Sequence, residues 1–352
     1  MKKLKGVIVG CGAIAREHLA AVADLPNVKI VALCDLSAAR AEAAADRFGV
    51  SEWYTSHEQL LANIQPDLVH ITTPPSAHFP VAQACLSAGL NVLCEKPITI
   101  NYSEFRALKQ LALENNCIFM ENQNFRYHSS IQRIFNLINA GDLGEILDAQ
   151  ICISLNIFGP GSPYVDLNTP HSTSVLRGGV IEDFLPHIAY LAYMCTGPVI
   201  DLRTVWTKHR SASPLSADEF RGIIRGERAT AYVSFSGNSQ PDGFWVRVAG
   251  TKAHAEANLY EPPRLTLRRL RAGEPAVTRL VDGINEAGAV LRGSVVGFWR
   301  KLGGTSSYDG LAELIKQTYV AVETGGPPPV ALDEIDDAAR IVDRFTTEEL
   351  KL

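Results

Sequence analysis

Short apolar runs alternate with amphipathic, alanine-rich segments over the first 121 residues. Val7–Val9 and Val28–Cys34 are largely apolar and rich in β-branched residues, which is typical of strands buried on both faces. The predicted strands are 7–9, 28–34, 68–72, 91–94 and 117–121, and the predicted helices are 13–23, 38–48, 77–88 and 102–115. This alternation predicts an α/β domain with a doubly wound, mostly parallel sheet and helices on both faces.

The pattern changes near residue 124, where apolar and polar residues begin to alternate with a period of two. Tyr232 alternates with Val233, and Phe244, Val246 and Val248 share one face. The predicted elements are helices near 130–140, 284–301, 306–323 and 332–346, and strands at 145–156, 229–236, 244–248 and 264–271. We therefore predict two domains, 1–123 and 124–352. The second is an α+β domain with a large, mostly antiparallel, open-faced sheet.

Composition and charge narrow the class of protein. Hydrophobic residues at 46% and charged residues at 20% are ordinary for a soluble globular protein. The net charge of -5 argues against nucleic acid or an anionic membrane as partner. No run of 18 apolar residues predicts a membrane span. The seven cysteines lie too far apart for a redox pair or a zinc ribbon, so we expect reduced thiols and no metal site.

The N-terminal segment superficially resembles a signal peptide. Lys2, Lys3 and Lys5 precede the apolar run Gly6–Ala15. The glycine spacing inside that run, and the second apolar run after it, favour a strand followed by a glycine turn. We therefore expect a cytoplasmic protein.

The glycine turn carries the first chemical signal. Gly10-Cys11-Gly12-Ala13-Ile14-Ala15 matches G-x-G-x-x-A between a predicted strand and a predicted helix. Gly10 would allow a tight turn, Gly12 a close approach to a pyrophosphate, and Ala15 close packing of the helix on the strand. The N–H groups of the helix N-terminus, at Ala13 and Ile14, would face the phosphates. This context predicts a dinucleotide-binding Rossmann domain.

Asp35 bears on the choice of cofactor. It ends the second predicted strand, 23 residues after Gly12, where an acid can hydrogen-bond the adenosine ribose. Alternatively, Asp35 is an acid near the N-cap of the next helix. A carboxylate here repels a 2′-phosphate, and Leu36 adds no positive charge. Alternatively, Arg40, one helical turn further along the chain, reaches a phosphate. We predict NAD rather than NADP.

Several further motifs give the chain its resemblance to a known family. These are Thr72-Thr73-Pro74-Pro75 with His78, Ala88-Gly89, Glu95-Lys96-Pro97, Asn124-Phe125-Arg126, Gly141–Ile146, and Gly178–Asp183 with His187. Together with the glycine turn, they resemble the family of glucose–fructose oxidoreductase and inositol dehydrogenase, the Gfo/Idh/MocA-type oxidoreductases. The resemblance covers about residues 4–195. It implies cofactor contacts from Thr73, Pro74, His78, Glu95 and Lys96, and a substrate contact from Arg126.

The chemistry of such an enzyme fits three residues. Lys96, at the carboxyl end of a parallel strand, would stabilise negative charge on the reacting oxygen, and a cis Lys96–Pro97 bond would direct it inward. His187 would act as acid and base, and Asp183, four residues earlier on the same helix face, would position the substrate. The simpler alternatives are a solvated lysine, an N-cap role for Asp183 and a packed helical histidine.

The resemblance implies an NAD(P)-dependent dehydrogenase or reductase, acting on a hydroxyl or carbonyl of a sugar, inositol or nucleotide-sugar-like compound. One alternative is an NAD-dependent glycoside hydrolase of the same fold, and another is a non-catalytic NAD(P)-binding sensor. Phe184-Leu185-Pro186 would stiffen the pocket wall, the 158–172 loop would line the same pocket, and Arg177 would either receive an anion or face water. The second sheet would form a homodimer or homotetramer, with Tyr232, Phe235, Phe244 and Trp245 as the supporting apolar residues.

Overall fold

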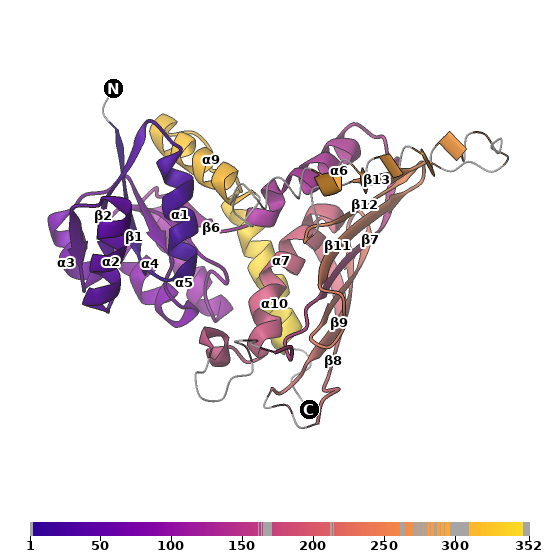
Figure 1. Cartoon of the computed structure of the whole chain (residues 1–352), viewed down its shortest axis with the longest axis horizontal. Coiled ribbons are helices and arrows are strands. Elements are labelled where there is room, and N and C mark those ends of the chain that lie inside the picture. Colours follow the sequence, from indigo (N-terminus) through magenta and orange to yellow (C-terminus); the bar gives the residue numbers. More distant parts are fainter. Residues whose placement is uncertain are drawn as a thin grey trace. The chain divides into compact units, whose positions relative to one another are not determined.

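The computed structural model describes residues 3–160, 162, 164, 171–211, 213, 215–260, 265–269, 273, 277, 280, 281, 283, 284, 287, 288, 290, 291, 293–295 and 310–347. The chain forms two compact units (Figure 1). The first contains Met1–Asn124 and Tyr308–Asp343, and the second contains Phe125–Ser307 and Arg344–Leu352.

A six-stranded parallel sheet forms the centre of the first unit, as the alternation of strands and helices predicts. Its strand order is β3-β2-β1-β4-β5-β6, and every neighbouring pair is parallel. The strands are β1 (Leu4–Val9), β2 (Val28–Cys34), β3 (Glu52–Tyr54), β4 (Leu68–Ile71), β5 (Asn91–Cys94) and β6 (Phe119–Glu121). The helices between them are α1 (Ala13–Ala23), α2 (Ala38–Phe48), α3 (His57–Asn63), α4 (His78–Ser87) and α5 (Tyr102–Glu114), with the 3-10 turn η1 (Pro75–Ala77).

The sequence patterns do not indicate β3 and α3. The edge strand β3 has three residues and none of them is buried, so it has no apolar run to reveal it. The seven-residue α3 buries only Leu60.

Two C-terminal helices, α9 (Leu311–Thr324) and α10 (Leu332–Thr347), contribute to the first unit through residue 343. Helix α9 packs against α1, and Lys109 of α5 contacts Asp333 and Asp336 of α10 at 2.7 and 2.6 Å. The sequence-based division places these helices in 124–352, and the structure differs from it here. An amphipathic pattern shows which helix face is buried, but not which sheet buries it.

A seven-stranded mixed sheet forms the second unit, in the order β13-β12-β11-β7-β10-β9-β8. Among the strand pairs that the structure describes in this sheet, only β7–β10 is parallel, so the predicted mostly antiparallel sheet is confirmed. The strands are β7 (Ile146–Ser154), β8 (Val199–Thr207), β9 (Glu219–Gly226), β10 (Thr230–Ser236), β11 (Gly243–Gly250), β12 (His254–Asn258) and β13 (Thr266–Arg268). The helical elements are η2 (Asn124–Tyr127), α6 (Ser129–Asn139), η4 (Ser172–Val175) and α7 (Gly179–Thr196). The helix predicted at 284–301 lies largely outside the described residues.

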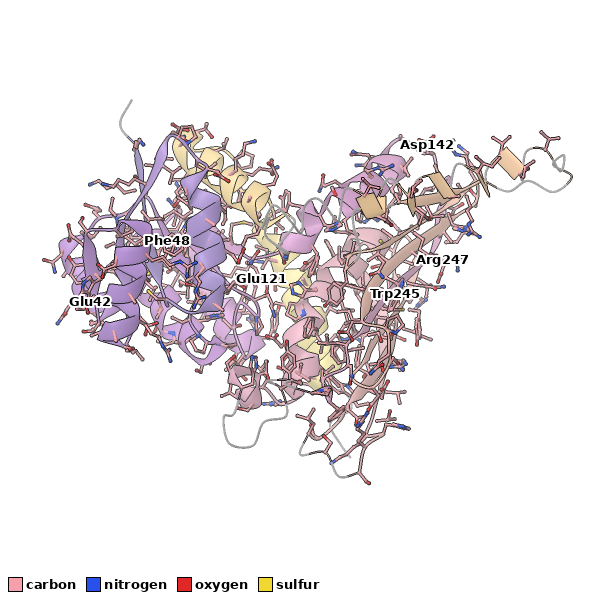
Figure 2. All side chains as sticks on the ribbon, in the orientation of Figure 1. Glu42, Phe48, Glu121, Asp142, Trp245 and Arg247 are labelled. Atoms are coloured by element: carbon pink, nitrogen blue, oxygen red, sulfur yellow. The ribbon has the colours of Figure 1, made fainter. Side chains whose placement is uncertain are left out.

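One face of this sheet is covered and the other is open. Helix α7 packs on β7, β9 and β10, where Phe235 and Phe244 are fully buried. On the other face, one cross-strand row contains Val205, Arg221, Ser234, Cys152 and Trp245, and the next contains Arg203, Ile223, Tyr232, Gln150 and Arg247 (Figure 2). Tyr232 and Trp245 therefore lie on the open face, whereas the expectation that Phe235 and Phe244 contribute to it is wrong.

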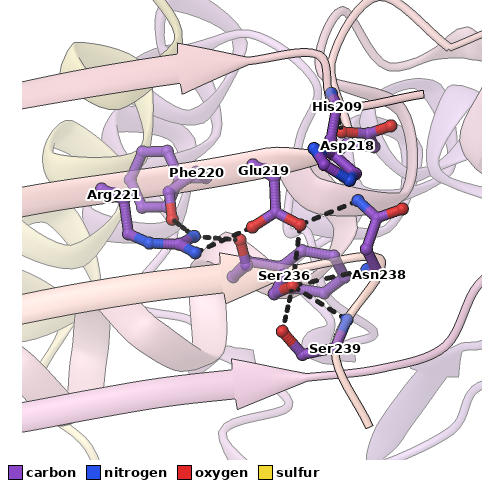
Figure 3. Close-up of polar contacts among 9 residues, drawn as sticks. His209, Asp218, Glu219, Phe220, Arg221, Ser236, Asn238 and Ser239 are labelled. Carbon is purple, nitrogen blue, oxygen red and sulfur yellow. Dashed lines mark hydrogen bonds and ion pairs between the residues drawn. The ribbon is translucent and has the colours of Figure 1, made fainter. Parts of the chain in front are cut away.

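A polar cluster fixes the ends of β9 and β10 (Figure 3). Glu219 accepts hydrogen bonds from Ser236 Oγ, Asn238 Nδ2 and Arg221 at 2.8 Å each. The buried Asp218 accepts the backbone N–H groups of His209 and Arg210. Each carboxylate thus has its partners inside the sheet end, so this cluster has a structural role.

The structure adds three observations on the expected class of protein. All seven cysteines are free thiols, and five of them are buried. In the parts of the chain that the structure describes, no helix combines the length and the apolar character needed to cross a bilayer. Over the same residues, no group of three or more His, Cys, Asp or Glu side chains is placed to hold a metal ion.

Candidate active site

The glycine turn after β1 has the geometry that the motif predicts. Gly10 has a φ of 100°, and a Cβ there would lie 2.6 Å from the backbone of Thr72 and Thr73. Gly12 has a φ of -74°, and a Cβ there would meet no atom within 4 Å. The fold itself therefore requires glycine at position 10, whereas position 12 faces open space.

The N-terminus of α1 follows the glycine turn, and the first N–H groups of a helix have no partner within the helix itself. Gly12 is its N-cap residue, with no side-chain hydrogen bond, and no acidic residue lies in the first turn. Ala15 is buried against the sheet, which keeps the helix close to β1. Nearby, Thr73 Oγ1 is buried and has no hydrogen-bond partner within the described structure. The open space at Gly12, the helix N-terminus and the Thr73 hydroxyl fit a bound dinucleotide.

Asp35 lies at the same edge of the sheet. Its Oδ2 accepts the backbone N–H of Cys11 at 2.9 Å, and its Oδ1 accepts that of Ser37 at 2.8 Å. Ser37 is the N-cap residue of α2, and Asp35 accepts its backbone N–H, so Asp35 is also an acid near the N-cap of this helix, as the alternative describes. Leu36 is 92% exposed and Arg40 is also exposed.

His78 lies between the loops that follow β4 and β5. It is fully buried, with Nδ1 2.8 Å from Pro97 O and Nε2 2.9 Å from Thr73 O. Both ring nitrogens thus contact backbone carbonyls, and the side chain connects the loop after β4 to the loop after β5. Pro74, by contrast, is exposed on the first of these loops.

Glu95 and Lys96 follow β5 at the carboxyl edge of the sheet. Glu95 is buried and accepts hydrogen bonds from Asn122 Nδ2 at 2.6 Å and from the backbone N–H of Lys96 at 3.2 Å. Its carboxylate thus contacts protein groups beside Lys96. The Lys96–Pro97 peptide bond is cis, as predicted.

Glu121 is a site residue that the sequence patterns do not single out (Figure 2). It ends β6, is buried, and accepts Ile98 N–H at 3.1 Å and Gln123 Nε2 at 3.2 Å. Burial raises the pKa of Glu121 to about 7, against the lowering effects of these hydrogen bonds and of Lys96. Its place as the last residue of a parallel strand is the signal that could have identified it.

The predicted acid and base, His187, and the predicted substrate-positioning residue, Asp183, both lie on α7 in the second unit. Asp183 is half-buried and His187 is buried, one helical turn apart. His187 Nδ1 lies 2.9 Å from Tyr190 Oη, which also accepts the backbone N–H of Phe125 at 3.2 Å. Tyr190 thus orients the imidazole. Its position three residues after His187, on the same helix face, could have indicated this role.

The N-cap alternative for Asp183 is wrong, because α7 begins four residues earlier, at Gly179. The Gly178 N–H is instead bound by Glu182 Oε2 at 2.7 Å. Pro186, part of the predicted pocket wall, lies inside this helix.

The remaining predicted residues are placed as follows. Arg126 is half-buried in η2, and its carbonyl accepts Gln132 Nε2 at 2.7 Å. Arg177 is exposed. The predicted pocket loop 158–172 lies in large part outside the described residues. Lys96 belongs to the first unit, and Asp183, His187 and Arg126 belong to the second.

Comparison with known proteins agrees with this geometry. Residues 4–123 match the model of an oxidoreductase family with an NAD-binding Rossmann fold. The chain is 28% identical over 214 residues to D-apiose dehydrogenase of Paraburkholderia graminis, covering 60% of this chain and 55% of that protein. It is 33% identical over 230 residues to dTDP-3,4-didehydro-2,6-dideoxy-alpha-D-glucose 3-reductase of Streptomyces violaceoruber, covering 65% of this chain and 63% of that protein.

Solved structures resemble the chain over nearly its whole length. Levoglucosan dehydrogenase, in complex with NADH and levoglucosan, superposes with a TM-score of 0.79 at 18% identity, covering 98% of this chain and 96% of that one. At this identity the likeness concerns the fold.

The fold and the glycine turn define the class: a two-unit protein whose first unit is an NAD-binding Rossmann domain. The match to the oxidoreductase family rests on that unit, and the chain is also 33% identical over 148 residues to inositol 2-dehydrogenase of Salmonella typhimurium, covering 41% of this chain and 44% of that protein. The matched segments cover little more than half the length of the first two curated relatives.

Proposed function

We propose that this protein is an NAD-dependent dehydrogenase or reductase, acting on a secondary hydroxyl or carbonyl of a sugar, inositol or nucleotide-sugar-like compound. The observation that carries the proposal is His187, buried on α7 and oriented by Tyr190, in a chain whose Rossmann unit has Lys96 at its carboxyl edge. Relatives named as D-apiose dehydrogenase and inositol 2-dehydrogenase support this substrate class.

In the oxidation direction, His187 takes the hydroxyl proton of the substrate. The Tyr190 hydroxyl can accept a hydrogen bond from Nδ1–H, and Nε2, the other ring nitrogen, then takes this proton. The Lys96 ammonium stabilises the negative charge that develops on the oxygen, and Asp183 hydrogen-bonds a neighbouring hydroxyl. When bound, nicotinamide supplies the acceptor for the hydride from the carbinol carbon.

We propose NAD rather than NADP as the cofactor. Asp35 places a carboxylate at the end of β2, where the adenosine ribose of a Rossmann cofactor is bound. The adjacent Leu36 offers no positive charge to a 2′-phosphate.

The test is a screen of NAD⁺ and NADP⁺ reduction against sugars, inositols and nucleotide sugars. We expect NADH formation with a polyol or sugar, reduced about 10²–10⁴-fold in Lys96→Ala and His187→Ala. Tyr102→Phe, which changes a hydroxyl on α5 outside the site, should leave the rate unchanged.

Three outcomes would contradict the proposal. Turnover of a glycoside with no change in reduced-nicotinamide absorbance would identify a hydrolase. Biological activity that survives both substitutions but not Gly12 substitution would identify a sensor. Faster reduction of NADP⁺ would reverse the proposed cofactor preference.

A further inference from the structure

A continuous line of buried polar side chains runs through the first unit. Tyr319 Oη lies 2.9 Å from His70 Nε2, and His70 Nδ1 lies 2.9 Å from His18 Nδ1. His18 Nε2 in turn lies 3.0 Å from Glu95 Oε1. We refer to Tyr319, His70, His18 and Glu95 as the buried relay.

The relay is isolated from water. His18 and His70 are 0% exposed, Tyr319 is 1% exposed and Glu95 is 6% exposed. Its members come from α9, β4, α1 and the segment after β5. Buried polar groups need partners, and here every ring nitrogen of both histidines contacts another member of the relay.

With both imidazoles neutral and Glu95 ionised, only one arrangement of the protons satisfies all three contacts. Glu95 can only accept, so His18 must carry its proton on Nε2 and accept at Nδ1. His70 must then donate from Nδ1 and accept at Nε2 from the Tyr319 hydroxyl. Every hydrogen bond of the relay therefore points toward Glu95, and two outside donors, Asn122 Nδ2 and the Lys96 N–H, complete the carboxylate shell.

Gly6 on β1 provides the space for Tyr319. A Cβ at this position would lie 2.1 Å from Tyr319 Oη and 2.7 Å from Ile30 Cδ1. Gly6 lies in a strand and does not have a positive φ. Position 6 therefore requires glycine because Tyr319 approaches it closely, and not because of its backbone conformation.

We propose that Tyr319, His70 and His18 are positioning residues for Lys96, because they hold Glu95 as a carboxylate that binds the Lys96 backbone N–H and supports the charge of its ammonium. This inference rests on the role of Lys96 in the proposed function. The relay transfers no proton in the reaction; it fixes the charge and the place of its neighbour.

Burial determines the ionisation of His70 in this arrangement. It lowers the pKa of His70 far below its usual range, so that its ring is neutral. Burial alone would raise the pKa of Glu95, but the contacts with His18 and Asn122, and the charge of Lys96, lower it. Outside the relay, Lys96 lowers the pKa of Glu95, and Asp67 adds to the effect of burial in raising the pKa of Tyr319. Glu95 in turn adds to the effect of burial in raising the pKa values of Glu121 and Cys94.

The first experiment measures the tautomers, by ¹⁵N NMR of the full chain labelled in histidine. The His18 and His70 signals are assigned with His18→Gln and His70→Gln. At neutral pH we expect His18 protonated only on Nε2, and His70 only on Nδ1, the minor form of free histidine. A proton on His18 Nδ1, or on His70 Nε2, would overturn the proposed direction of the relay.

The second experiment measures the pKa of the Lys96 amine by ¹³C NMR after reductive methylation with labelled formaldehyde, with Lys96→Ala for assignment. Tyr319→Phe removes the donor at the start of the relay, and Gly6→Ala displaces it. Because Glu95 is then easier to protonate, both should lower the Lys96 pKa by about one unit. Tyr102→Phe deletes the same atom from another tyrosine of this unit and should leave the pKa unchanged.

The outcomes separate this inference from the proposed function. An unchanged Lys96 pKa in both variants, or an equal fall in Tyr102→Phe, would refute the relay even if Lys96→Ala abolishes dehydrogenase activity. Full activity in Lys96→Ala would refute the proposed role of Lys96, while the tautomers would still report whether the relay forms. The tautomer measurement uses the unsubstituted chain, so it holds even if a variant fails to fold.

Discussion

At the scale of single residues, Gly10 and Gly12 lack a side chain for different reasons. A methyl group on Gly10 would collide with the backbone of Thr72 and Thr73, in a conformation that L-residues rarely adopt. A methyl group on Gly12 would point into space where the protein has no atom. The first glycine therefore maintains the fold, and the second keeps the N-terminus of α1 accessible.

This difference predicts opposite behaviour of two single substitutions. Gly10→Ala should destabilise the protein by about 2 kcal/mol or more, because it combines positive φ with backbone overlap. Gly12→Ala should change stability by less than about 1 kcal/mol, yet weaken NADH binding by about tenfold or more. Denaturant unfolding and NADH fluorescence titration measure the two effects. Unimpaired NADH binding by Gly12→Ala would show that the open space is not the cofactor site.

Much of the candidate site could be predicted from the sequence because its residues follow the ends of predicted strands. Gly10 and Asp35 come directly after apolar runs and Lys96 comes two residues after one, and the carboxyl ends of parallel strands share one edge. His70 and Tyr319 could not be predicted, since they are 249 residues apart and only folding brings them together. His70 lies within a strand and Tyr319 within an amphipathic helix, so both fit a packed core equally well.

At the scale of elements, apolar patterns located most strands and helices of the first unit, and the short or exposed ones were missed. The structure also attaches α10 to α5 through charged side chains. Lys109 contacts Asp336, whose side chain is 14% exposed, and Asp333, whose side chain is 89% exposed. The same lysine thus has a shielded partner and a solvated one.

The shielded pair, Lys109–Asp336, should contribute more to the stability of the fold than Lys109–Asp333, and its contribution should depend on pH. Burial raises the pKa of Asp336, but hydrogen bonds from Lys109 and Tyr102 outweigh it and hold the pKa below the ordinary 3.8. A carboxyl whose pKa is lowered by folding stabilises the fold at pH values above its unfolded-state pKa. This stabilisation is lost as the pH falls through the pKa of the carboxyl in the folded state. Asp336→Asn should therefore cost about 1 kcal/mol at pH 7 and less below pH 4.

Asp333→Asn is the matched control, because it removes a carboxylate from the same lysine where water already screens the interaction. Urea unfolding of both variants at pH 7 and pH 3 measures the difference. If the two variants lose the same unfolding free energy at pH 7, the Lys109–Asp336 pair is not the main charged contact between α10 and α5.

At the scale of the whole molecule, the second sheet presents a broad uncovered face. It combines exposed apolar side chains, Val205, Ile223 and Tyr232, with Arg203 and Arg221 in the same cross-strand rows. An apolar surface on paired strands is a common oligomer interface. We propose that this face packs on a second copy of the chain, in a homodimer or homotetramer.

Light scattering should then give at least twice the chain mass of 38.3 kDa at micromolar concentration. Tyr232→Asp combined with Ile223→Asp should reduce the mass to that of one chain, because each substitution would bury an unpaired charge. Leu113→Asp, at an exposed apolar position on α5, should leave the mass unchanged. A monomeric mass for the unsubstituted protein would reject this interface.

The first unit contains both the N-terminal residues and the C-terminal helix α9, and this affects how the protein folds during synthesis. Synthesis runs from the N-terminus, and domains usually fold as they leave the ribosome. Here α9, which packs on α1 and carries the partner of His70, is translated only after the whole second sheet. The first unit is therefore the first to begin folding and the last to be completed. Until α9 is made, α1 lacks the helix that packs on it, and its uncovered face is a surface that chaperones can recognise.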